Sequence, residues 1–164
     1  MDSPADTTTA DKPLYDTDFF RWTQRQAEAI RAAASVRINT PQPIDWENVA
    51  EEIEDLGKSV RRELYSRVRV VIEHLVKLSA SSAIEPRRGW TETILEQRAE
   101  IEQLLHENPS LRGIVQDATL RGTVGARKLV SRAARLHGET LTRSLDDLTF
   151  TPQQVLDDWF PTEP

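Results

Sequence analysis

The 164-residue chain has 21 basic and 27 acidic residues, a formal net charge of −6, and no cysteine. The lack of cysteine excludes disulfides, thiolate metal sites and thiol nucleophiles, and the acidic balance argues against a dedicated nucleic-acid binder, whose footprint is usually basic. The polar residues 1–13 lack the apolar segment of a signal peptide, and no apolar run is long enough to cross a bilayer. We therefore expect a disordered leader over residues 1–13, a single helical domain over 14–164 and a cytoplasmic location.

Apolar residues recur at steps of three and four along the chain, with Gly and Pro at the breaks, and this pattern predicts an all-α fold. No strand-like alternation interrupts it. The first helix is expected to begin after Asp16, whose carboxylate can cap it. We predict a compact bundle of four main helices, over about 17–37, 46–81, 90–107 and 109–137, and a short C-terminal helix over about 152–158.

The second helix is predicted to run without a break through Gly57. Its apolar positions from Val49 to Leu78 keep steps of three and four across this glycine, so the apolar stripe does not lose phase. A glycine inside a helix costs about 1 kcal/mol relative to alanine, which packing on both sides has to offset. The tripeptide Gly57-Lys58-Ser59 resembles the end of a phosphate-binding loop, but Glu52 stands where that motif needs a glycine.

The fourth helix is expected to begin with Asn108 as N-cap and Pro109 as its first residue. Gly122 and Gly125 leave a shallow groove on this helix where another helix could approach closely. Gly138 is the expected C-cap.

The C-terminal segment contains a capping-box pattern, Thr151-Pro152-Gln153-Gln154, which predicts the start of the short last helix. The aromatic pair Trp159 and Phe160 follows, and we expect it to pack back onto the bundle.

The beginning of the second helix is strongly acidic, with six Asp or Glu residues and no Lys or Arg between positions 38 and 57. The simplest interpretation is a solvated face whose charges suit the positive end of the helix dipole. These residues form a candidate polar surface, which consists of Asp45, Trp46, Glu51, Glu52, Glu54, Asp55 and Arg62.

A metal site is the alternative interpretation of the same segment. Carboxylates that share a helix face can hold Mg²⁺ or Mn²⁺ through their oxygens, so a metal-dependent phosphohydrolase could use Glu51, Glu54 and Asp55. Such a cage needs carboxylates from a second helix, and the best available pair there is Glu96 and Glu100.

The fourth helix is basic over its second half, with five basic residues and no acid between positions 119 and 138. An acidic helix and a basic helix in one small bundle most simply face each other or flank the same surface, and the alternative is that one or both meet an external partner. The candidate basic partner surface consists of Arg121, Arg127, Lys128, Arg132 and Arg135.

Several of these residues recur in a recognisable order: Tyr15-Asp16 with a following Trp22, then Asp45-Trp46-Glu47, and then an acidic run that ends in Leu56-Gly57-Lys58-Ser59. This order resembles the bacterial domain-of-unknown-function family twenty-nine, and the resemblance covers about residues 14–161. It implies a compact all-α fold in a bacterial cytoplasmic setting. It implies no established activity, ligand or catalytic residue.

The charge-sorted helices, the glycine groove and the lack of a catalytic pattern together favour a non-catalytic helical module for protein–protein interaction, which binds another protein or itself. No cofactor and no membrane partner are predicted. The phosphohydrolase is the alternative function. A third hypothesis, nucleic-acid binding through Arg121 to Arg135, has the net charge against it.

Overall fold

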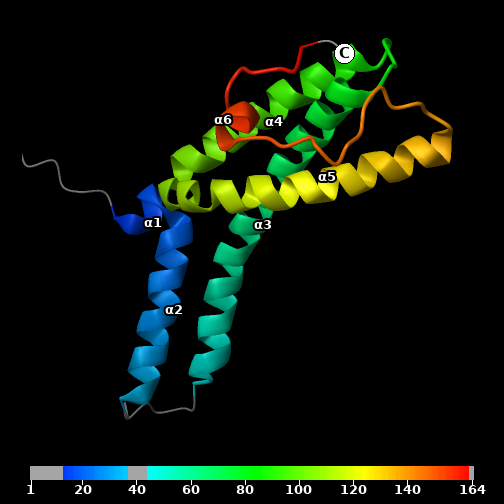
Figure 1. The fold of residues 1–164 in the computed structure, drawn as a ribbon. Coiled ribbons are helices and arrows are strands. Elements are labelled where there is room, and N and C mark those ends of the chain that lie inside the picture. The colour runs from blue at the N-terminus through cyan, green and yellow to red at the C-terminus, as the bar shows by residue number, and fades with distance from the viewer. Residues whose placement is uncertain (1–12, 37–43, 163–164) are drawn as a thin grey trace, which may run out of the picture.

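The computed structural model describes residues 13–36 and 44–162, and Figure 1 shows their arrangement. Of the expected disordered leader, only Pro13 falls within the described residues. The described part of the chain contains no β-strand, so the prediction of an all-α fold is confirmed. Its helices are α1 (Leu14–Thr17), α2 (Phe19–Ser35), α3 (Trp46–Ala80), α4 (Arg87–Glu107), the 3₁₀ helix η1 (Pro109–Ile114), α5 (Val115–His137) and α6 (Pro152–Leu156).

The 35-residue helix α3 is the axis of the molecule. Its first half packs against α2, and the two form a helical arm that projects from the remaining helices (Figure 1). Its second half packs against α4 and α5, and most of the buried apolar side chains lie there. The largest fully buried apolar side chains of this core are Leu64, Val68, Val71, Ile72, Leu75, Val76, Ile94, Ile101, Leu111 and Val155.

The continuity of α3 through Gly57 is confirmed. Gly57 is buried in the seam of the arm, where it faces Thr23 and Phe20 of α2. Ala27 and Ala50 are also fully buried in the arm. Small side chains let two helices approach closely, so this glycine allows the close packing of α2 on α3.

The start of the first long helix differs from the prediction. Asp16 lies inside the one-turn helix α1, and Asp18 caps α2 instead, because its carboxylate accepts a hydrogen bond from the Arg21 amide at 2.9 Å. The same buried carboxylate accepts from the amide and the hydroxyl of Ser110, both at 2.8 Å. These hydrogen bonds between Asp18 and Ser110 of η1 hold the start of α2 in place.

The predicted fourth helix is divided into η1 and α5. The side chain of Asn108 does not cap η1, because its amide bridges two other elements: it accepts from the Phe20 amide at 3.0 Å and donates to the Leu104 carbonyl at 3.1 Å. Gly138 ends α5 with a φ of 67°, as expected for a left-handed C-cap.

The helix α4 begins at Arg87, earlier than predicted. The Arg87 guanidinium donates to the carbonyls of Leu78, at 3.0 Å, and Ser81, at 3.4 Å. These carbonyls belong to the end of α3, so the arginine satisfies acceptors that the helix leaves unpaired.

The C-terminal helix α6 has the predicted capping box, formed by Thr151 and Gln154. It ends at Leu156, two residues before the predicted end, and Arg98 of α4 binds carbonyls both of its last turn and of the segment that follows. The buried Arg98 guanidinium donates to Gln154 and Val155, both at 2.9 Å, and to Trp159 at 2.7 Å. Trp159 and Phe160 pack against the core, as expected.

Candidate functional site

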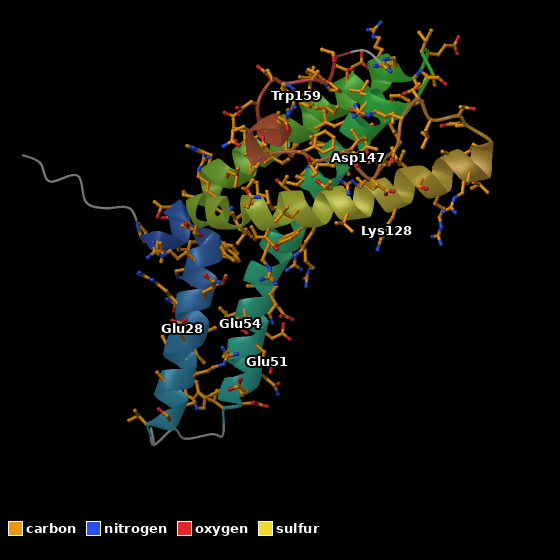
Figure 2. The ribbon with its side chains drawn as sticks, viewed as in Figure 1. Glu28, Glu51, Glu54, Lys128, Asp147 and Trp159 are labelled. Carbon is orange, nitrogen blue, oxygen red and sulfur yellow. The ribbon has the colours of Figure 1, made fainter. Side chains whose placement is uncertain are left out.

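The candidate polar surface lies on the arm, where Figure 2 shows Glu51 and Glu54. Its partner there is Arg31 of α2. The Arg31 guanidinium lies 3.0 Å from a Glu47 oxygen. It also forms a bidentate ion pair with the Glu54 carboxylate, in which both nitrogen–oxygen distances are 3.2 Å. The expectation that the acidic segment faces the basic helix is therefore wrong. No ion pair between described residues joins it to α5, whose Lys128 lies on another part of the molecule (Figure 2).

Two carboxylates of this surface are held by cations, which perturb their ionisation. The bond from Arg31 lowers the pKa of Glu54 below its usual value of 4.5. Lys58 lies 2.8 Å from Asp55 and 3.7 Å from Glu54, and its bond lowers the pKa of Asp55. Both carboxylates are therefore held in their charged form by neighbours on the arm.

The described residues do not assemble the metal site of the alternative hypothesis. They contain no group of three or more His, Asp or Glu side chains that could hold a metal ion. Glu54 and Asp55 are directed to Arg31 and Lys58. The expected second carboxylate helix, α4, packs on the other half of α3, and its Glu100 forms an ion pair with Arg67 at 3.1 Å.

The other members of the polar surface have local roles or face solvent. Asp45 caps α3, since its carboxylate accepts from the Asn48 amide at 3.2 Å. Trp46 is half-buried in the first turn, and Glu51, Glu52 and Arg62 are exposed.

The candidate basic partner surface on α5 is divided into two parts. Arg121 forms one of them: it binds Asp117 at 2.8 Å, and its guanidinium lies 5.7 Å from the centre of the Tyr65 ring. The Tyr65 hydroxyl also donates to Asp117, and this bond raises the pKa of Tyr65 and lowers the pKa of Asp117. Arg121 is therefore neutralised within a small cluster of its own.

The other four basic residues of α5 line a groove of about 770 Å³ between α5 and the segment that follows it. Arg69 of α3 and Arg143, after α5, lie in the same groove. We call this the cationic groove and define its basic residues as Arg69, Arg127, Lys128, Arg132, Arg135 and Arg143.

The cationic groove has an unbalanced charge. Asp146 is the one acidic residue among those that line it. None of its six cations forms an ion pair with another described residue. Arg127 is held in place because its Nε donates to the Leu148 carbonyl at 2.7 Å. Three apolar side chains, Leu129, Leu141 and Leu145, also line the groove.

Sequence reasoning missed Arg69 and Arg143 because they lie outside α5. The glycines of α5 were the available signal for Arg69. A Cβ at Gly122 would lie 2.9 Å from the Ile72 Cδ1 and 3.5 Å from the Arg69 Cα, so α3 crosses α5 there. Gly122 is thus covered by α3 of the same chain, whereas Gly125 stays partly exposed and lines the cationic groove. The crossing at Gly122 brings Arg69 to the cations of α5.

The fold and the groove define an all-α protein with a two-helix arm and a cationic groove beside its penultimate helix. The model of the family described as domain of unknown function DUF29 matches residues 14–160, and the chain belongs to this family, as the sequence order predicted. An alpha-helical protein of unknown function from Rhodospirillum rubrum has a similar structure, with a TM-score of 0.71 and 24% identity, over 92% of this chain and 94% of that one. At this identity the likeness shows the fold alone. No curated protein matches the chain.

Proposed function

We propose that this chain is a protein–protein interaction module of a bacterial cytoplasmic protein, and that its cationic groove binds an acidic segment of the partner. The observation that carries this proposal is the charge of the groove. Six cations and one acid, Asp146, line it in a chain whose net charge is −6. On the arm, by contrast, Glu54 pairs with Arg31 and Asp55 pairs with Lys58.

Six cations that converge around a single carboxylate repel one another, and an anionic ligand relieves this repulsion. The effect is strongest in a concave site, because the walls reduce screening by solvent. A complementary acidic segment would be attracted before contact and oriented on arrival. Binding of this kind weakens as the salt concentration rises.

The lining of the groove favours a protein segment over a nucleic acid. Leu129, Leu141 and Leu145 offer apolar contacts beside the charges, and Leu129 is 40% exposed. No aromatic side chain lines the groove to stack on a base. The net charge of −6 also repels a long polyanion. A volume of about 770 Å³ falls in the range of small ligand sites, so it fits a short segment that carries both carboxylates and an apolar side chain.

The test uses the full chain and two fluorescent probes of equal charge: a Glu-rich peptide that contains leucines, and a single-stranded DNA oligonucleotide. Binding is measured by fluorescence anisotropy at several salt concentrations. We expect the peptide to bind more tightly than the DNA. The double variant Arg132→Ala/Arg135→Ala should weaken peptide binding by about tenfold or more, which corresponds to about 1.4 kcal/mol.

The matched control is Arg21→Ala/Arg25→Ala, which removes two exposed arginines of α2 outside the groove. It makes the same change in net charge, so it should leave peptide affinity within about twofold of the native value. Equal losses in both variants would mean that net charge, and not the groove, attracts the peptide. Tighter binding of the DNA would assign the groove to nucleic acid and overturn the proposal.

A further inference from the structure

The arm has two sides of different character. One side carries the ion pairs of Arg31 with Glu47 and Glu54, and of Lys58 with Asp55. The opposite side of α3 carries Val49, Ile53, Leu56 and Val60, at steps of four, three and four, which form a stripe along one helix face. Val49 is 42% exposed and Leu56 is 50% exposed, so no element of the described chain covers this stripe fully.

The helix α2 adds a second stripe on the same side of the arm. Thr23 and Ala27 mark the seam with α3, since both are buried. Arg31 lies on one side of that seam and reaches Glu54. The helical period therefore turns the half-buried residues Trp22, Gln26, Ile30 and Ala33 to the other side, beside the stripe of α3.

These two stripes form one surface without a charged residue. We call it the uncharged face and define it as Trp22, Gln26, Ile30, Ala33, Val49, Ile53, Leu56 and Val60. Val49 and Leu56 are seven positions apart, and so are Ile53 and Val60, and Gln26 and Ala33. This is the repeat of helices that pack side by side in bundles.

We propose that the uncharged face binds the same face of a second copy of this chain, so that two arms form a four-helix bundle. Two chains of net charge −6 repel each other over most surfaces. The uncharged face is where they can meet without opposing carboxylates, because Glu47 and Glu54 lie on the other side with Arg31. A two-fold interface also needs a surface that complements itself, and a continuous uncharged face does so.

The size of the face fits a weak dimer. The 17 residues of α2 span about 25 Å at 1.5 Å per residue, and two helices side by side are about 20 Å wide. Each copy would bury about 500 Å², or about 1,000 Å² in total, which is near the lower limit for a specific interface. Residues 1–12 have few apolar side chains that could pack on the uncharged face: besides one proline, these are Met1, Ala5 and Ala10.

The oligomeric state tests this proposal by sedimentation velocity, from about 1 to about 500 µM protein, the range in which a micromolar dimer dissociates. We expect the native chain to change from monomer to dimer. The variant Val49→Glu/Leu56→Glu should raise the dimer dissociation constant by about tenfold or more. Both positions are exposed, so circular dichroism should show a native helix content.

The matched control is Asn48→Glu/Ser59→Glu. It adds the same two charges at exposed positions of α3 outside the uncharged face, and it should dimerise like the native chain. A native chain that stays monomeric throughout would overturn the proposal, and so would a dimer that survives Val49→Glu/Leu56→Glu. Neither variant changes a residue of the cationic groove. A failure of the dimer proposal can therefore be told apart from a failure of the proposal that the groove binds an acidic segment.

A second readout uses the absence of native cysteine. Leu56→Cys should form a disulfide-linked dimer on mild oxidation more readily than an exposed cysteine elsewhere, because the interface holds the two copies of this face together. Leu136→Cys on α5 is the control, since Leu136 is apolar and 78% exposed but lies away from the arm. Equal cross-linking at both positions would indicate random collision and would contradict the proposal.

Discussion

Replacing Gly57 with alanine tests the close approach of α2 and α3 in the arm. A Cβ at this position would overlap the hydroxyl oxygen of Thr23 and lie 3.3 Å from the Thr23 Cβ and 3.5 Å from a ring carbon of Phe20. Thr23 cannot turn away without loss, because it is fully buried and its hydroxyl donates to the Phe20 carbonyl at 2.8 Å. The added methyl group therefore has to move a side chain or separate the helices.

The expected magnitude is a balance of three effects. Alanine gains about 1 kcal/mol over glycine inside a helix. Overpacking a buried contact costs about 1–3 kcal/mol, and losing the Thr23 hydrogen bond costs about 1 kcal/mol. The net effect of Gly57→Ala is a loss of about 2 kcal/mol in the free energy of unfolding. For a chain of this size, this lowers the Tm by about 4–8 °C.

Urea and thermal unfolding, followed by circular dichroism, measure this loss. Gly125→Ala is the control, since a Cβ there would meet the Arg69 Cδ at 3.8 Å, an ordinary contact. It should stabilise the chain by about 1 kcal/mol through helix propensity alone. Thr23→Ala should remove most of the penalty of Gly57→Ala, as contacting residues are not additive. If Gly57→Ala is as stable as Gly125→Ala, the two helices of the arm do not touch at this point.

Three further predictions concern ties between elements. Arg98→Met should lower the free energy of unfolding by about 3 kcal/mol and expose the C-terminal segment to proteolysis, because three carbonyls lose a charged donor. Arg88→Met, at an exposed arginine, should change neither the stability nor the rate of proteolysis. Asp18→Ala should lower the free energy of unfolding in urea by about 2–3 kcal/mol, since it removes the cap of α2 and both hydrogen bonds from Ser110. A loss near zero would contradict a stabilising role of these hydrogen bonds. Arg31 lowers the pKa of Glu54, so its stabilising effect is complete above pH 4.5 and is lost as the pH falls through the lowered value. Below pH 4.5 the native chain should therefore lose stability more steeply than Glu54→Gln, as urea midpoints from pH 7 to pH 3 will show; parallel curves would contradict this role.

The sequence predicted the long elements well because their signals are local. The stripe of α3 keeps its phase through Gly57, and the capping box at Thr151 needs side chains only three residues apart. The ends of α2 and η1 were missed for the opposite reason. Asp18 and Asn108 each bind groups about 90 residues away, and no local pattern carries that information.

The expected pairing of the acidic segment with the basic helix was wrong, because a helical pattern shows which residues share a face but not which helix packs against that face. The first half of α3 packs against α2, which brings a single arginine, Arg31, to Glu47 and Glu54. Arg31 is isolated in an Ala-rich stretch, so it gave a weaker signal than the five basic residues of the fourth helix. The cationic groove was found in part, since its α5 members are clustered in sequence, whereas Arg69 reaches it only through the crossing at Gly122.

The two proposed surfaces are linked by the one uninterrupted helix α3. Leu56 of the uncharged face and Arg69 of the cationic groove are 13 residues apart on it, which is about 20 Å at 1.5 Å per residue. A helix without a break keeps this spacing fixed. A dimer formed through the arms would therefore hold two cationic grooves at a defined separation, and a partner with two acidic segments would bind both with a higher effective concentration than a partner with one. On this view the close seam at Gly57 serves the groove as well as the arm, because it keeps the arm rigid enough to set that separation.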